Sequence, residues 1–257
     1  LWKYCQSVKD LECIRPLYGK LIKKAADFLV SYRDPQTHLP LPSYDLWEER
    51  YALHTYTVAS VIAGLRAAGN FAKLFQDNTL AEKYDSVADE MTVGINQHLY
   101  HKGLKRFARS GSRIEGGYKL DEVIDISLLS LATLGVLDPK NPQMVETAHA
   151  VREQLWLKTP IEGCARYQGD VYQRAEDSPN DIPGNPWFIS TLWLAEYYID
   201  LAENLEELQV ALPYLEWCVK NSLPSGVLAE QVHPVTGSPI CVSPLTWSHS
   251  AFVWTVL

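Results

Sequence analysis

The sequence predicts an all-α fold, because the helical period recurs along most of the chain and the alternation typical of strands is nearly absent. Apolar residues between Leu80 and Leu99 return every three to four positions, which places them on one face of a helix. Comparable stripes predict about eight helices, near 15–33, 54–75, 79–99, 125–134, 142–157, 187–203, 206–221 and 245–257.

Five of these ranges have the clearest apolar stripes. The first two consist of Leu17, Leu21, Ile22, Ala25, Phe28, Leu29 and Tyr32, and of Val58, Val61, Ile62 and Leu65. The third contains Leu80, Tyr84, Val87, Ala88, Met91, Ile95 and Leu99. The last two consist of Val145, Ala148, Val151 and Leu155, and of Leu208, Leu212, Leu215 and Val219.

Four segments rich in proline, glycine and aromatic residues separate the helices: 34–50, 100–122, 158–186 and 222–244. They exceed the roughly 12–15 residues beyond which a structureless loop is usually functional or disordered, and their Trp, Tyr and Arg content disfavours disorder. We therefore predict one domain over 1–257, a helical scaffold with long ordered loops at one end.

Composition excludes several classes of protein. The net charge of −8 and the absence of a Lys or Arg run argue against a nucleic-acid partner. No apolar stretch reaches the ~18 residues of a membrane span. The five cysteines are odd in number and lack zinc-site spacing, which favours reduced, buried thiols in a cytoplasmic protein.

The segment from Tyr44 to Arg50 is the most unusual in the chain. It places Glu48 and Glu49 beside Trp47, in a proline-stiffened loop that leads toward a helix. An apolar wall beside a carboxyl group is the setting that a general acid needs. Alternatively, the two carboxylates lie at the start of the helix, where its dipole favours anions.

Two further segments contain candidate site residues. Arg166, Asp170, Tyr172 and Trp187 suit sugar recognition, although an Arg-Asp pair is often a surface ion pair and a Trp before a helix is often core. Glu230 stands alone in an apolar run, which marks either a site carboxylate or a half-exposed loop residue.

Other chemistry has weaker support. His98 and His101 could share a helix face, but no third ligand accompanies them, so no metal site is predicted. The chain has neither a glycine-rich phosphate loop nor a Gly-x-Ser-x-Gly elbow. We expect no cofactor.

Three segments, taken in chain order, resemble glycoside hydrolase family 15: the one with Glu48, the one with Arg166 to Trp187 and the one with Glu230. This family includes glucoamylases, glucodextranases and some trehalases. Tyr44-Asp45-Leu46-Trp47-Glu48-Glu49 resembles the general-acid motif of the family. The resemblance implies that Glu48 protonates the glycosidic oxygen, that Glu49 lies at the neighbouring sugar subsite, and that Tyr44 and Trp47 contact the substrate.

The other two segments resemble the sugar-binding loop and the general-base segment of the same family. The resemblance implies that Arg166, Asp170, Tyr172 and Trp187 hold the terminal glucosyl unit and that Glu230 is the general base. It is carried by Arg166-Tyr167 with Asp170 and Tyr172, by Asn185-Pro186-Trp187-Phe188, by Gly226-Val227-Leu228-Ala229-Glu230-Gln231 and by Leu245-Thr246-Trp247-Ser248.

The resemblance covers about residue 15 to the end and implies a partial (α/α)6 toroid, with about eight of its twelve helices. The expected protein is an inverting, exo-acting α-glucoside hydrolase that releases β-glucose from non-reducing ends. Its amino-terminal helices would come from an upstream segment or another chain. The alternative is a carbohydrate-binding or regulatory toroid without turnover: the two catalytic Glu residues argue against it, and the missing helices argue for it. A helical scaffold for binding proteins would leave the Trp- and Glu-rich loops unexplained.

Overall fold

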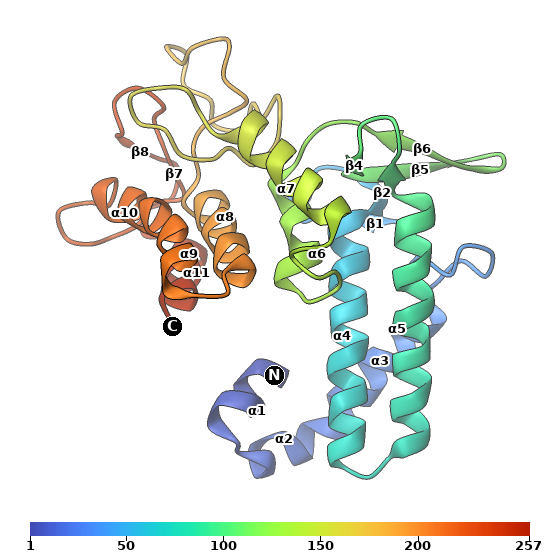
Figure 1. Ribbon diagram of the computed structural model, residues 1–257. Helices are drawn as coiled ribbons and strands as arrows, with labels where there is room; N and C mark the ends of the chain where they lie inside the picture. The colour runs from blue at the N-terminus through green and yellow to red at the C-terminus, as the bar shows by residue number, and fades with distance from the viewer. The chain divides into compact units, whose positions relative to one another are not determined.

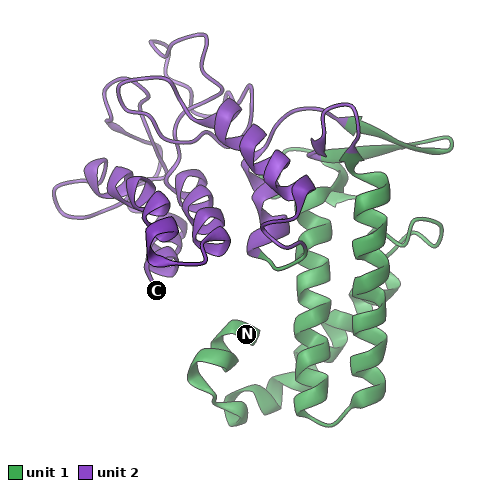
Figure 2. Ribbon diagram, in the orientation of Figure 1, with its two compact units in different colours: residues 1–100, 110–120, 134–136 green, residues 101–109, 121–133, 137–257 purple.

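The computed structural model describes all of residues 1–257, and the contacts within it divide the chain into two compact units. Unit 1 consists of 1–100, 110–120 and 134–136, and unit 2 of 101–109, 121–133 and 137–257 (Figure 2). A single domain over 1–257 stays a prediction.

Helices make up most of unit 1 (Figure 1). They are α1 (Trp2–Val8), α2 (Leu11–Leu17), the π-helical η1 (Tyr18–Ile22), α3 (Lys23–Ser31), α4 (Thr55–Leu74) and α5 (Asn78–His98). The long helices α4 and α5 form an antiparallel pair joined by residues 75–77. Gly69 permits their close approach, since a Cβ there would lie 2.5 Å from Oδ1 of Asp85.

A small sheet completes unit 1. Its strands, in the order β1-β2-β5-β6, are β1 (Ser43–Tyr44), β2 (Tyr51–His54), β5 (Ser110–Ile114) and β6 (Gly117–Asp121). β2 pairs antiparallel with β5, with Leu53 opposite Gly111 and His54 opposite Ser110. The sequence pattern does not indicate this sheet, because none of its strands exceeds five residues and a period of two is hard to recognise over so short a length.

Unit 2 is built around α8. Its helices are the 3-10 helix η2 (Ile126–Leu129), α6 (Ser130–Thr133), α7 (Pro142–Leu155), α8 (Phe188–Leu201), α9 (Leu205–Leu208), the 3-10 helix η3 (Gln209–Ala211), α10 (Leu212–Lys220) and α11 (Thr246–Val256). α8 packs against both α10 and α11, which explains why it is apolar on more than one face. Phe188, Leu192 and Trp217 belong to the core between them.

Short strands lie in the segments that sequence analysis treated as loops. They are β3 (Tyr100–His101), β4 (Arg106–Phe107), β7 (Gln231–Val232) and β8 (Pro239–Ile240). β7 pairs antiparallel with β8, with Gln231 opposite Ile240. The segment 222–244 is therefore partly a hairpin.

Each of the eight predicted helical ranges contains helix. The first begins earlier than predicted, at Leu11, where the Asp10 carboxylate caps it by accepting from the N–H of Cys13 at 3.1 Å. α1 lies ahead of all predicted ranges. No helix in residues 1–257 combines the length and apolarity that a membrane crossing requires.

The cysteine prediction is partly wrong. None of the five cysteines forms a disulfide, and Cys5, Cys164 and Cys218 are buried as predicted. Cys13 is exposed because the short helix α2 buries only Ile14, and Cys241, which follows β8, is exposed as well. The cytoplasmic location stays a prediction.

Candidate active site

The segment predicted to hold the general acid forms the loop of a β-hairpin in unit 1, between β1 and β2. The buried Asp45 closes this loop. Its N–H donates to the carbonyl of Arg50 at 2.9 Å, and its Oδ1 accepts from the N–H groups of Glu49 at 2.7 Å and Arg50 at 3.2 Å. Glu48 lies at the exposed turn with a φ of 59°. A non-glycine residue in this left-handed region costs free energy and is typical of functional sites.

The interpretation of Glu48 and Glu49 as a helix start is wrong. The hairpin continues into β2, and α4 begins only at Thr55. A turn therefore positions the exposed carboxylate of Glu48, and no helix begins at this residue to stabilise its negative charge.

The other predicted residues of this segment lie beside the turn. Oε2 of Glu49 accepts from the Arg50 guanidinium at 2.8 Å. Trp47 is half-buried. Tyr44 is 65% exposed and meets the ring of Tyr51 edge-on, with centroids 5.5 Å apart. An exposed tyrosine ring braced by a second one is a surface on which a sugar can stack.

The predicted sugar-binding loop of unit 2 contains a buried ion pair. Nε and Nη2 of Arg166 donate to the two carboxylate oxygens of Asp170 at 2.7 and 2.8 Å. Arg166 is 4% exposed and Asp170 1% exposed, so the interpretation as a surface ion pair is wrong. Oδ1 of Asp170 also accepts from the N–H of Tyr172 at 3.0 Å. The pair thus fixes the backbone that presents Tyr172.

Aromatic rings surround the Arg166 guanidinium. Its carbon lies 4.5 Å from the ring centroid of Trp187, 5.0 Å from that of Tyr172 and 5.2 Å from that of Tyr167. Such distances permit cation–π attraction. Trp187 is buried in the core and also contacts Arg166, so the core interpretation holds for it, and its role in sugar binding stays a prediction.

Glu230 adjoins this cluster at the start of β7. Its N–H donates to the carbonyl of Val242 at 2.9 Å, and its carbonyl accepts from the N–H of Phe188 at 3.4 Å. Its half-buried carboxylate accepts from Nε2 of Gln231 at 3.3 Å. Oε1 of the fully buried Gln231 accepts in turn from Nδ2 of Asn185 at 2.7 Å.

Tyr172 and Cys241 also lie near the Glu230 carboxylate. The Tyr172 hydroxyl is 3.8 Å from Sγ of Cys241. The hydrogen bond with Cys241 and the negative charge of Glu230 raise the pKa of Tyr172. Burial, followed by its hydrogen bond to Glu230, raises the pKa of the Cys241 thiol. Both groups are therefore neutral near pH 7 and able to donate hydrogen bonds.

The structure thus forms two groups of predicted residues. Tyr44, Trp47, Glu48 and Glu49 share the hairpin of unit 1, and Arg166, Asp170, Tyr172, Trp187 and Glu230 share one region of unit 2. Asn185, Gln231 and Cys241 were not among the predicted site residues. In the sequence, the position of Gln231 directly after Glu230 could have indicated a role for it, whereas no sequence pattern indicated a role for Cys241.

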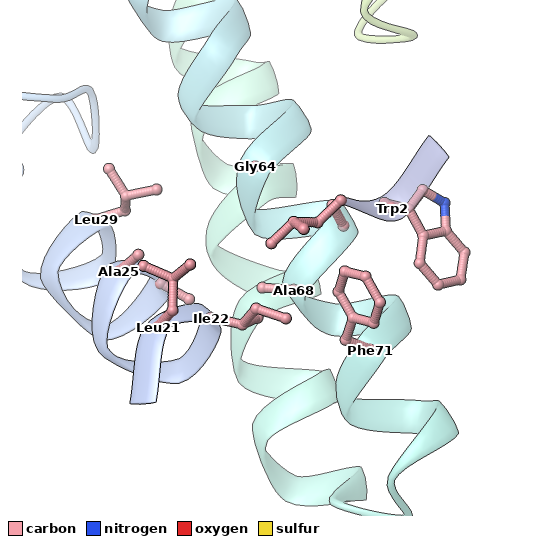
Figure 3. A pocket seen from close by; sticks show the side chains of 11 residues that line it. Trp2, Leu21, Ile22, Ala25, Leu29, Gly64, Ala68 and Phe71 are labelled. Carbon is pink, nitrogen blue, oxygen red and sulfur yellow. The ribbon is translucent and has the colours of Figure 1, made fainter. Parts of the chain in front are cut away.

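An apolar cavity of about 250 Å³ lies elsewhere in unit 1, between α1, η1 with α3, and α4. Figure 3 shows Trp2, Leu21, Leu29 and Phe71 around it. Its lining has no ionisable side chain, so it is unsuited to acid–base chemistry. No group of three or more His, Cys, Asp or Glu in residues 1–257 is placed to hold a metal ion.

Comparison with known proteins identifies the family. Residues 14–257 match the model described as glycosyl hydrolases family 15. The chain belongs to this family. It is 30% identical over 246 residues to an uncharacterised glycosyl hydrolase of Methanocaldococcus jannaschii, a match that covers 92% of this chain and 36% of the relative. It is 28% identical to a glucoamylase of Clostridium sp., with 92% of this chain and 35% of the relative covered. The chain thus spans about a third of the length of these relatives.

The fold of this family 15 chain matches a solved glucoamylase. A crystal structure of a bacterial glucoamylase complexed with acarbose aligns with a TM-score of 0.77 at 25% identity, over 94% of this chain and 37% of the other. The predicted fold class, a helical part of an (α/α)6 toroid, is confirmed by this match. The structure also contains short strands, which the prediction did not include.

Proposed function

We propose that this family 15 chain contains the two catalytic carboxylates of an inverting, exo-acting α-glucoside hydrolase that releases β-glucose from non-reducing ends. The observation that supports this proposal best is the cluster in unit 2, where a buried Arg166–Asp170 pair and two aromatic rings adjoin the Glu230 carboxylate. Two carboxylates acting on opposite sides of a glycosidic bond are what hydrolysis with inversion requires.

In the proposed reaction, Glu48 is the general acid. Its protonated carboxyl donates a proton to the glycosidic oxygen as the bond to the anomeric carbon breaks. Exposure at a hairpin turn suits this role, because the carboxyl must reach a substrate atom outside the chain. The hydrogen bonds that Asp45 accepts from Glu49 and Arg50 limit the motion of the turn and so fix where that proton is delivered.

Glu230 is the proposed general base. It removes a proton from a water molecule whose oxygen attacks the anomeric carbon from the face opposite the leaving group. One displacement forms one carbon–oxygen bond and breaks another, and the α-linkage becomes a β-hydroxyl. Gln231 donates to Oε2 of Glu230, and a carboxylate has further lone pairs that can accept a hydrogen bond from the water.

The proposed terminal glucosyl site uses the remaining residues of unit 2. The ring of Tyr172 is 41% exposed and offers an apolar face to a sugar, while the Arg166–Asp170 pair beneath it holds the loop. The proposed subsite for the second sugar of the substrate, next to the terminal glucosyl unit, is formed by Glu49, Tyr44 and Trp47. No step requires a metal or an organic cofactor.

The test is the configuration of the first product. The complete gene product that contains this chain is mixed with α-1,4, α-1,6 and α,α-1,1 glucosides, and the anomeric proton of released glucose is followed by NMR. β-Glucose is expected first, with α-glucose appearing only through mutarotation. Initial α-glucose would refute the role of Glu230 as base. Binding of glucosides without hydrolysis would identify the non-catalytic carbohydrate-binding alternative.

A further inference from the structure

The residue opposite Glu230 follows from the register of the β7–β8 hairpin. Gln231 is opposite Ile240, and Val232 is opposite Pro239. One position further out, Glu230 and Cys241 are therefore neighbours across the hairpin.

The backbone at Cys241 departs from a regular strand. Cys241 has a φ of 64°, and the N–H of Glu230 donates to the carbonyl of the next residue, Val242. Cys241 and Val242 therefore both lie opposite Glu230, as in a β-bulge. Such bulges often redirect side chains beside active sites. Glycine adopts this backbone most easily, so a side chain here is kept at a conformational cost.

That side chain contacts two groups of the candidate site. Its sulfur lies 3.8 Å from the Tyr172 hydroxyl, and hydrogen bonding of the thiol to the Glu230 carboxylate contributes to the raised pKa of Cys241. Gln231 donates to the same carboxylate at 3.3 Å. The Glu230 carboxylate is thus held by an amide and a thiol.

We propose that Cys241 is a positioning residue for Glu230, and that its thiol fixes the carboxylate in the orientation that takes a proton from the attacking water. This inference rests on the proposed function. A general base must lie within hydrogen-bond distance of its proton, and a carboxylate free to rotate spends less time there. The thiol itself transfers no proton and forms no bond with the substrate.

The first test measures hydrolysis by the complete gene product. Cys241→Ala is expected to lower kcat about tenfold, with KM within about twofold of wild type, because a positioning role affects the chemical step. Cys241→Ser keeps a donor and should recover most of kcat. Cys241→Gly suits the left-handed backbone, so it should fold as well as wild type and still lose kcat like the alanine variant.

A double-mutant cycle separates positioning from general damage. In a Glu230→Gln background, assayed with α-glucosyl fluoride, Cys241→Ala should cause no further loss, since the group it positions is gone. Equal losses in both backgrounds would overturn the inference. So would alanine and glycine variants with kcat within about twofold of wild type.

A second test does not depend on turnover. Glu230→Gln removes the negative charge beside the thiol, so the thiolate fraction of Cys241 rises and iodoacetamide should alkylate it faster at pH 8, measured by peptide mass spectrometry. Exposed Cys13, far in sequence from the site, is the internal control and should not change. An unchanged rate at Cys241 would refute the contact. A wild-type protein that hydrolyses no glucoside would refute the proposed function and this role in turnover, whatever the alkylation rates.

Discussion

Replacing Asp170 by Asn tests whether the buried ion pair stabilises the fold of unit 2. The carboxylate accepts two charge-assisted hydrogen bonds from Arg166 and one from the N–H of Tyr172. Asn keeps the shape and one acceptor, but leaves the 4%-exposed guanidinium without the countercharge of Asp170. Removing one partner of a buried pair typically costs about 3–5 kcal/mol, so a loss of about 3 kcal/mol is expected for this mild change.

The assay is reversible unfolding of the complete gene product in urea, followed by tryptophan fluorescence. The melting temperature should fall as well. The matched control is Glu203→Gln, which removes the exposed ion pair with Lys140 in the same unit and should leave the unfolding midpoint unchanged. If Asp170→Asn shifts the midpoint no more than this control, burial of the pair does not stabilise the fold and the reasoning is wrong.

Three further predictions concern catalysis and thiols. Glu48→Gln should lower kcat on natural glucosides by at least about 100-fold with little change in binding, and turnover within about tenfold of wild type would exclude it as the acid. An experimental structure of the complete protein should place the carboxyl groups of Glu48 and Glu230 ~6.5–9.5 Å apart; a separation of ~5–5.5 Å would indicate a retaining enzyme. Burial raises the pKa of Cys164 and Cys218, so both should resist Ellman's reagent at neutral pH until the protein is denatured, whereas exposed Cys13 should react in the native state.

The helices could be predicted because each buries a long apolar stripe. In α5, the residues Tyr84, Met91 and Ile95 are fully buried, and their spacing alone indicates the helical face. The hairpin that places Glu48 could not be predicted in this way. Its strands are two and four residues long, and the Asp45 hydrogen bonds that close it depend on the folded backbone.

The candidate site was predictable to the extent that its residues lie in contiguous motifs. Arg166 and Asp170 are four positions apart in one loop, so the pair could be anticipated, although its burial could not. Cys241 is close to Glu230 only through the pairing of β7 with β8, two strands of two residues each. Such a contact depends on register, which no local pattern of the chain reveals.

The buried hydrogen bond between Asn185 and Gln231 has a consequence for local unfolding. It joins the loop that ends at Trp187 to the segment that begins with Glu230, and the backbones of Trp187 and Gln231 also pair. Opening either segment exposes the buried amide of the other, so the two should open together as one cooperative unit. The N–H groups of Phe188 and Val232 donate to the carbonyls of Glu230 and Pro186 across this contact. Hydrogen exchange at these two groups should therefore report one shared opening free energy, and a slow motion in the loop that ends at Trp187 would reach Glu230 as well.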